Sequence, residues 1–282
     1  MNEMPIRLDH QAVLDILPDR LPDTHKGDYG KILLLCGSRG YTGAAALAAM
    51  GALRCGAGLV YLGVPDSIYA IEAVKLNEPI VFPLEDAEGK LSAAAVSSIE
   101  TMLPQMDAVL IGCGLGCSMG TLAVLQYVLN AFTGPVIVDA DGINLLSAHK
   151  DILRGRTAPT ILTPHDGEFA RLGYHGQRVP SAVSAAKELG CIVLLKGKDT
   201  VITNGSTVYL NSTGNPGMAT GGCGDVLAGM ITALVGQGID PLQATAAAAW
   251  LHGKAGDVCA TELGQYGMLP SDMISILPRL MK

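Results

Sequence analysis

A lone carboxylate at the start of an apolar stretch is the side chain of this sequence best suited to chemistry. Asp225 is the one charged residue between Thr200 and Ile239. It follows the glycine-rich run Gly214–Gly224 and precedes Val226–Val235, which we expect to form a buried helix because it is apolar all round. Backbone N–H groups of such a glycine-rich helix start can hold an anion. A carboxylate beside bound phosphate could act as a base on a group that meets the phosphate.

The alternative for Asp225 is a helix cap, because aspartate is a favoured N-cap residue. A cap needs one tight turn, whereas five glycines precede this helix, at positions 214, 217, 221, 222 and 224. Glycine loses the most conformational entropy on folding, so this density of glycines indicates a loop whose backbone closely approaches a ligand or another segment. The glycines favour the base over the cap without excluding the cap.

A second polar group, Lys196-Gly-Lys-Asp-Thr200, follows an apolar run that we expect to be a strand. A lysine at such a strand end is well placed as a point charge for phosphate. Lys198 competes with Lys196 for this role, and one of the two could be only a solvated charge. The sequence contains no GxxxxGK[ST] run, so it is not a P-loop protein.

Two carboxylates, Asp139 and Asp141, end another expected strand. In extended geometry residues two apart share a face, so the pair could hold Mg²⁺ through water. The alternative is that one of them caps the turn at residues 142–146 while the other is a solvated charge.

Two histidines, His165 and His252, are candidates for ligand-binding side chains. His165 lies just past a strand, next to Pro164, and could hydrogen-bond a ligand or only the adjacent turn. His252 lies in an alanine-rich helix beside Trp250, where a core or surface histidine is the better interpretation.

Two further glycine loops follow strands. The glycines of Gly37–Gly43 do not have the GxGxxG spacing, and no acidic residue ends a second strand about 20 residues on, which disfavours a dehydrogenase-type dinucleotide site. Small residues at Gly43, Ala44 and Ala45 would let a bulky ligand lie against a helix start, although ordinary strand-to-helix packing would use them too. The run Gly112–Gly116 is equally consistent with a tight turn.

Composition narrows the class of protein. The chain has 282 residues, 49% of them apolar, a net charge of −7 and a pI near 5.3, which disfavours nucleic acid as a partner. No apolar run approaches the roughly 20 residues that cross a bilayer. Seven dispersed cysteines complete no zinc site, although Cys113 and Cys117 have CxxxC spacing. They indicate free thiols in a reducing cytoplasm.

Short apolar runs alternate with alanine-rich ones, which predicts a mainly parallel sheet covered by helices on both faces. We expect strands at 31–36, 59–64, 80–83, 108–111, 136–139, 160–162 and 191–196. We expect helices at 44–55, 67–74, 93–102, 121–130, 167–172, 182–189, 225–235, 241–259 and 271–280. Asn204-Gly205 predicts a type I′ hairpin turn. Residues 1–25 look like a lead-in, followed by one domain, 26–282.

The glycine loops and polar groups fall at the carboxyl ends of the expected strands, where open α/β sheets bind ligands. With them assembled, the chain resembles the ADP-dependent NAD(P)H-hydrate dehydratases of the ribokinase-like superfamily, over nearly its whole length from His25. The matching stretches are Gly43–Ala49, Arg54–Val60, Gly112–Gly116, Asp139–Asn144, Thr163–Glu168, Lys196–Thr200 and Asn215–Asp225.

This resemblance implies a three-layer α/β/α sandwich, usually in a homotetramer. It implies dehydration of the 6S-hydrate of NADH or NADPH, driven by hydrolysis of ADP to AMP and phosphate, with Mg²⁺. The expected nucleotide and anion-hole residues are Lys196, Gly197, Lys198, Asp199, Thr200, Gly222 and Gly224. The expected hydrate-binding residues are Gly43, Ala44, Ala45, Gly116, Asn144, His165 and Asp225.

Asp225 would be the base that takes a proton from the ring hydroxyl as it attacks a phosphoryl group. Two positions depart from the family pattern: Cys223 stands where threonine is usual, and Tyr41 where methionine is common. We expect the cysteine to slow turnover by removing a hydroxyl donor. We expect no fused epimerase domain, and a separate epimerase could act in the same pathway. The alternative function is an ATP-dependent kinase of a hydroxymethyl pyrimidine or thiazole.

Overall fold

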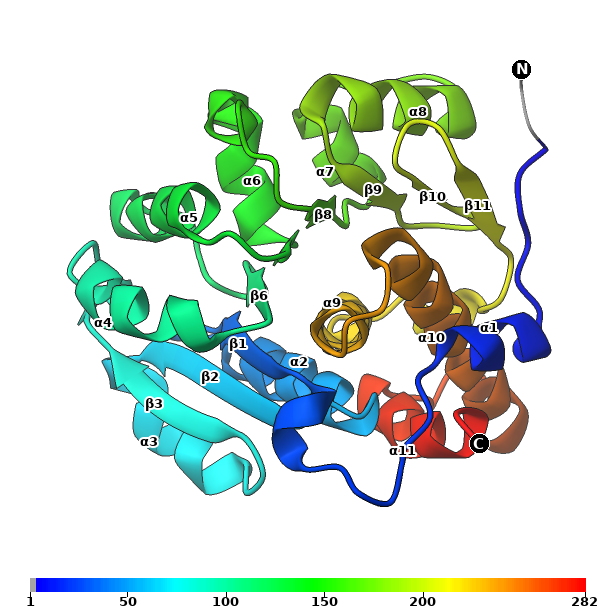
Figure 1. The fold of residues 1–282 in the computed structure, drawn as a ribbon, viewed down its shortest axis with the longest axis horizontal. Coiled ribbons are helices and arrows are strands. Elements are labelled where there is room, and N and C mark those ends of the chain that lie inside the picture. The colour runs from blue at the N-terminus through cyan, green and yellow to red at the C-terminus, as the bar shows by residue number, and fades with distance from the viewer. Residues whose placement is uncertain (1–3) are drawn as a thin grey trace.

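A nine-stranded sheet forms the centre of the molecule in a computed structural model that describes residues 4–282 (Figure 1). The strand order is β11-β10-β9-β8-β7-β6-β1-β2-β3. All neighbouring strands are parallel except at β10, which runs antiparallel to β9 and to β11. The predicted mainly parallel sheet is therefore confirmed.

The strands lie close to the positions that the apolar runs predict. They are β1 (Lys31–Leu35), β2 (Leu59–Pro65), β3 (Ile80–Leu84), β6 (Ala108–Ile111), β7 (Val136–Val138), β8 (Thr160–Leu162), β9 (Ile192–Leu195), β10 (Thr200–Thr203) and β11 (Val208–Asn211). A small two-stranded ribbon, which the sequence did not predict, joins β4 (Asp86–Ala87) to β5 (Lys90–Leu91).

Helices cover both faces of the sheet. They are α1 (His10–Ile16), α2 (Thr42–Arg54), α3 (Asp66–Lys75), α4 (Ala95–Met102), α5 (Met119–Ala131), α6 (Asp141–Ala148), α7 (Asp166–Arg171), α8 (Arg178–Leu189), α9 (Cys223–Gly236), α10 (Pro241–Leu263) and α11 (Pro270–Leu280). Short 3-10 turns occupy Lys26–Tyr29, Leu103–Gln105, Lys150–Leu153 and Pro216–Met218.

Alternation along β1 shows the three layers directly. Ile32 and Leu34 pack into the core beneath α2, α9 and α10, whereas Leu33 and Leu35 pack with α4 and α5 on the other face. Both sets are fully buried, as expected for a parallel strand covered on its two sides. The three-layer ribokinase-like sandwich is confirmed. No helix among residues 4–282 has the length and apolar character that crossing a bilayer requires.

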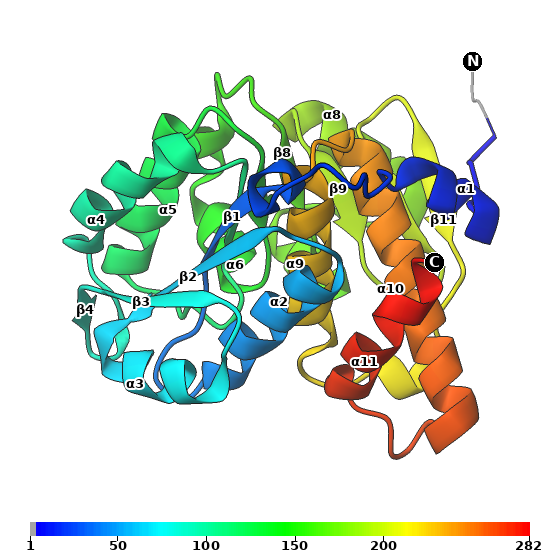
Figure 2. The same ribbon diagram turned by 60° about the horizontal axis from the view of Figure 1, so that its bottom comes forward.

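Helices α2 and α9 pack against one another unusually closely (Figure 2). A Cβ added at Gly51 would lie 2.7 Å from the Val226 carbonyl oxygen, and one at Gly229 would lie 2.0 Å from the Ala48 carbonyl oxygen. Only glycine allows such an approach of two backbones. The contact fixes the starts of both helices, at Thr42 and Cys223, relative to each other.

The hairpin between β10 and β11 is present, but the predicted type I′ turn is wrong. Thr203 pairs with Val208, so the loop has four residues and not two. Only Gly205 has a positive φ in this loop, whereas a type I′ turn needs two such residues. The Asn204 side chain accepts hydrogen bonds from the backbone N–H groups of Ser206 and Thr207, which favours the longer loop.

The expected lead-in, as far as residues 4–25 are described, carries helix α1. Its Val13 is fully buried, and the His10 ring stacks on Trp250 with centroids 5.4 Å apart. The division of the chain at residue 25 stays a prediction.

Candidate active site

Helix α9 begins two residues earlier than its apolar pattern predicts. Gly222 is the N-cap, with φ 102°, and Cys223 opens the helix, so Asp225 occupies its third position. No side chain caps this end, and interpreting Asp225 as the cap is wrong. The first N–H groups of a helix have no partners within the helix. The start of α9 thus offers backbone donors next to a carboxylate.

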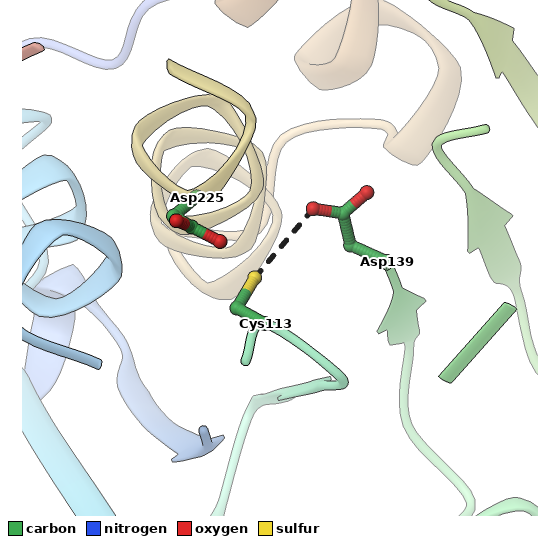
Figure 3. A group of neighbouring side chains, drawn as sticks. All are labelled: Cys113, Asp139 and Asp225. Carbon is green, nitrogen blue, oxygen red and sulfur yellow. Dashed lines mark hydrogen bonds between the residues drawn. The ribbon is translucent and has the colours of Figure 1, made fainter. Parts of the chain in front are cut away.

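The Asp225 carboxylate points toward two buried side chains from the ends of β6 and β7 (Figure 3). One ligand atom each from Cys113, Asp139 and Asp225 lie within 4.8 Å of one another. The Cys113 thiol donates to Asp139 Oδ2 over 3.6 Å. We call these three residues the acid–thiol cluster.

Lys196, at the end of β9, closes this cluster on its other side. Its Nζ donates to Asp139 Oδ1 over 2.7 Å and lies 3.8 Å from Glu168 Oε2. The Thr163 hydroxyl also donates to Asp139 Oδ1, over 2.7 Å. A Cβ at Gly224 would stand 3.4 Å from the lysine Nζ. The predicted lysine, glycine and base therefore lie together where the carboxyl ends of β6, β7, β8 and β9 meet.

The electrostatics of the cluster follow from burial and like charge. Burial first, and then the Asp139 carboxylate, raise the pKa of Asp225 to about 6. Burial acts to lower the pKa of Lys196, but Asp139 and Glu168 together raise it above its usual range. Contact with the Cys36 thiol, and then burial, raise the pKa of the Cys113 thiol, which keeps it a proton donor. Asp225 is thus an ionised but readily protonated carboxylate at neutral pH.

The geometry assumed for Asp139 and Asp141 is wrong. Ala140 has φ 47°, so the backbone is not extended, and Asp141 already belongs to α6. Asp141 Oδ2 accepts from the Gly116 N–H over 2.8 Å, while Asp139 Oδ1 is used by Lys196. The two carboxylates therefore do not form a ready pair for Mg²⁺.

His165 caps α7 instead of standing free. Its Nδ1 accepts from the Gly167 N–H over 2.9 Å and from the Glu168 N–H over 3.3 Å. Its ring remains about half exposed, so a ligand could still reach it. His252 is a core residue, as expected, with 7% of its surface exposed.

The rest of the predicted nucleotide loop lies at the surface. Gly197, Lys198 and Asp199 are exposed, and the Thr200 hydroxyl donates to the Gly197 carbonyl. Asp199 adopts a left-handed conformation with φ 53°. The structure therefore separates Lys196, which faces the cluster, from Lys198, which faces solvent.

The residues predicted to bind the hydrate lie at the start of α2 and in the loop after β6. Gly43 is exposed, whereas the Ala45 side chain is fully buried, so only backbone of Ala45 could meet a ligand. A Cβ at Gly114 would lie 2.7 Å from Ala44, which shows that the two segments touch. Asn144 donates to Asp141 Oδ1 over 3.3 Å and holds the carboxylate that binds Gly116.

Sequence reasoning missed four contributors. Glu168 is a buried carboxylate beside Lys196, and Thr163 orients Asp139. Arg178 donates to the carbonyls of Leu195 and Lys196 and so fixes the end of β9. The CxxxC spacing of Cys113 and Cys117 gave no indication that the Cys113 thiol contacts Asp139. The acidic residue three positions after His165 was a capping signal that could have pointed to Glu168.

This fold and this site define a ribokinase-like enzyme class, in which an aspartate at a glycine-rich helix start faces a lysine at the sheet edge. The structure resembles a ribokinase-like superfamily protein from Enterococcus faecalis, with a TM-score of 0.86 and 28% identity, over 98% of this chain and 94% of that one. Residues 32–279 match the family model described as NAD(P)H-hydrate dehydratase, and the chain belongs to that family.

Two relatives illustrate the match. The ADP/ATP-dependent NAD(P)H-hydrate dehydratase of Bacillus subtilis, co-crystallised with ATP and Mg²⁺, shares 31% identity and a TM-score of 0.83, with 96% of each chain covered. The bifunctional NAD(P)H-hydrate repair enzyme Nnr of Moorella thermoacetica is 42% identical over 94% of this chain and 52% of its own length. The chain spans about half the length of the curated relatives that it matches.

These relatives do not favour the alternative of a vitamin-precursor kinase. A hydroxyethylthiazole kinase from Pyrococcus horikoshii has a TM-score of 0.63 at 18% identity, which shows the shared fold alone.

Proposed function

We propose that this protein dehydrates the 6S-hydrate of NADH or NADPH, with ADP hydrolysed to AMP and phosphate. The observation that carries the proposal is the placement of Asp225 at the third position of α9, facing Lys196 and Asp139. Membership of the NAD(P)H-hydrate dehydratase family supports the same reaction.

In the proposed reaction Asp225 accepts the proton of the ring hydroxyl as that oxygen attacks the terminal phosphoryl group of the nucleotide. A base with a pKa near the working pH combines ionisation with useful basicity. Phosphorylation converts the ring hydroxyl into a phosphate ester, and phosphate is a good leaving group. Loss of phosphate together with a ring proton restores the double bond. Asp225 and the donors at the start of α9 would serve both steps.

The developing phosphoryl charge would meet the backbone N–H groups of Gly222, Cys223 and Gly224. Lys196 would contribute a positive charge from the opposite side. The loop Gly197–Thr200 lies next to this lysine and is the proposed contact for the remainder of the nucleotide. Cys223 is buried, so its side chain adds no donor toward the phosphate, which fits the expected slower turnover.

On the substrate side, Gly43, Ala44 and backbone of Ala45 would contact the hydrated dinucleotide from α2. Gly116 and His165 would contact it from the strand-end loops, with Asn144 acting through Asp141. Mg²⁺ would enter with the nucleotide phosphates, whose charge it neutralises. ADP is proposed over ATP on the family resemblance, and the B. subtilis relative is described as ADP/ATP-dependent.

The test is to incubate the protein and Asp225→Asn with NADH hydrate, Mg²⁺ and either ADP or ATP. We expect recovery of reduced-nicotinamide absorbance only with nucleotide, and a loss of about 10²- to 10⁴-fold in the variant. Turnover by the variant within tenfold of wild type would remove the base assignment. Phosphorylation of a small alcohol without recovery of NADH would reject the reaction.

The same proposal includes a homotetramer in the cytoplasm and a separate NAD(P)H-hydrate epimerase that supplies the S form. Sedimentation would test the tetramer, and addition of a purified epimerase to a mixture of R and S hydrates would test the partnership.

A further inference from the structure

The acid–thiol cluster has the donor set of a metal site as well as of a catalytic base. It combines one thiol and two carboxylates whose ligand atoms lie within 4.8 Å of one another. Cys113 and Asp139 are buried, and Asp225 is partly exposed, so an ion could enter past Asp225. Thiolate and carboxylate are both ligands of Zn²⁺ in proteins.

The two oxygens of Asp139 have different partners, and this difference gives an independent reason to expect an ion. Oδ1 accepts strong hydrogen bonds from Lys196 and Thr163. Within residues 4–282, Oδ2 has only the weak thiol donor of Cys113, at 3.6 Å. A carboxylate oxygen on a residue with 1% of its surface exposed ordinarily has a stronger partner. The 3.6 Å separation of this oxygen from the Cys113 sulfur is compatible with both atoms binding one tetrahedral Zn²⁺ ion.

Charge balance favours the same conclusion. Three carboxylates, those of Asp139, Asp225 and Glu168, surround a single ammonium group, that of Lys196, so they carry uncompensated negative charge. A divalent ion that displaces the thiol proton of Cys113 would lower this net negative charge by one unit.

We propose that Cys113, Asp139 and Asp225 form an inhibitory site for a thiophilic divalent cation, such as Zn²⁺ or Cd²⁺. Binding breaks the S–H bond, forms a metal–sulfur bond and releases one proton to solvent, without any change of oxidation state. Mg²⁺ prefers oxygen ligands and would not be held by the thiolate. The bound ion would occupy the Asp225 carboxylate and prevent it from accepting a substrate proton.

The experiment is a Cd²⁺ titration of the reduced, nucleotide-free protein, read by thiolate-to-Cd²⁺ charge-transfer absorbance. Cys113→Ser is the test variant, and Cys117→Ser is its matched control because Cys117 is an exposed thiol four residues away. We expect one saturable ion per chain in wild type and in Cys117→Ser, and no such signal in Cys113→Ser. A signal that survives in Cys113→Ser, or that disappears in Cys117→Ser, would overturn the proposal.

Asp225→Asn tests the cluster without removing the thiol. We expect its Cd²⁺ affinity to fall by at least about tenfold while the charge-transfer band remains. Unchanged affinity would show that the ion binds Cys113 away from Asp225 and would reject the site. Excess Mg²⁺ should not displace Cd²⁺, and displacement would count against a thiolate ligand. These measurements need no turnover, so they are independent of the proposed reaction.

Discussion

A carboxylate oxygen of Asp225 lies within 4.8 Å of one of Asp139, which is itself paired with Lys196 at 2.7 Å. The proposed base therefore has both a like charge and a positive charge as neighbours. Their opposing effects, together with burial, decide how readily Asp225 takes up a proton. The chemistry of the site should accordingly respond to changes at either neighbour.

The first prediction concerns the acidic side of the pH–rate profile. Because the pKa of Asp225 is raised to about 6, kcat/KM should fall as the pH drops through 6 and the base becomes protonated. Asp139→Asn removes the like charge and should move this fall to lower pH. Lys196→Gln removes the positive charge and should move it to higher pH. Shifts of both variants in the same direction would contradict the electrostatic account.

The second prediction concerns stability. Asp225 has a folded-state pKa raised from 3.8 to about 6, so its ionisation on going from pH 4 to pH 7 destabilises the fold. Asp225→Asn should therefore raise the free energy of unfolding at pH 7, by up to about 3 kcal/mol at 1.4 kcal/mol per pKa unit. The gain should vanish below pH 4. Urea unfolding at the two pH values would measure it, and equal effects at both would disprove the linkage.

The third prediction concerns acid unfolding. Burial lowers the pKa of His252 from 6.5 to about 4, so the unfolded chain binds a proton first as the pH falls. Stability from this residue is complete above pH 6.5 and is lost between there and pH 4, by roughly 3 kcal/mol. His252→Gln should flatten this part of the stability curve. The exposed His175 supplies the control, and the curve should be unchanged in His175→Gln.

The fourth prediction concerns the contact between α2 and α9. Gly229→Ala would place a Cβ 2.0 Å from the Ala48 carbonyl oxygen, and forcing the helices apart should cost roughly 1–3 kcal/mol. Gly43→Ala meets nothing within 4 Å and lies in the first turn of α2, so it should not destabilise the fold.

Measurements of activity distinguish the role of Gly43 from that of Gly229. Gly43→Ala should raise KM for the hydrate if this residue lies against the substrate, and unchanged KM would remove it from the binding surface. Denaturant curves that rank Gly43→Ala below Gly229→Ala in stability would contradict the packing argument.

Local patterns were sufficient for most of the sheet. The run Ala108–Ile111 is apolar throughout because both faces of a parallel strand are covered, and its bounds were predicted correctly, whereas most other strands begin or end a residue away from the prediction. Helix α1 was missed because a segment of seven residues is too short for a helical period to be recognised, and its one buried residue, Val13, finds its partners far along the chain.

The sequence was sufficient to predict where the site residues lie in the fold, but not which side chains they contact. Strand ends located Asp139 and Lys196, and the glycine-rich helix start located Asp225, at one edge of the sheet, as expected for this architecture. Spacing could not show that Ala140 turns the chain with a positive φ, so that Asp139 and Asp141 face different partners. Nor could it show that the thiol of Cys113 completes the cluster, because a contact 26 residues apart depends on the register of neighbouring strands.

The close backbone contacts at Gly51 and Gly229 hold α2 and α9 together as one rigid unit. One end of each helix faces the proposed dinucleotide or phosphate, and the shared backbone contact sets the interval between those ends. The distance between the bound hydrate and the bound phosphate would then be fixed. A substrate hydroxyl too far from the phosphoryl group could not be brought closer by sliding the helices. Substrates would be selected by whether their hydroxyl lies close enough to the phosphoryl group. The motions that admit reactants and release products would occur in the strand-end loops.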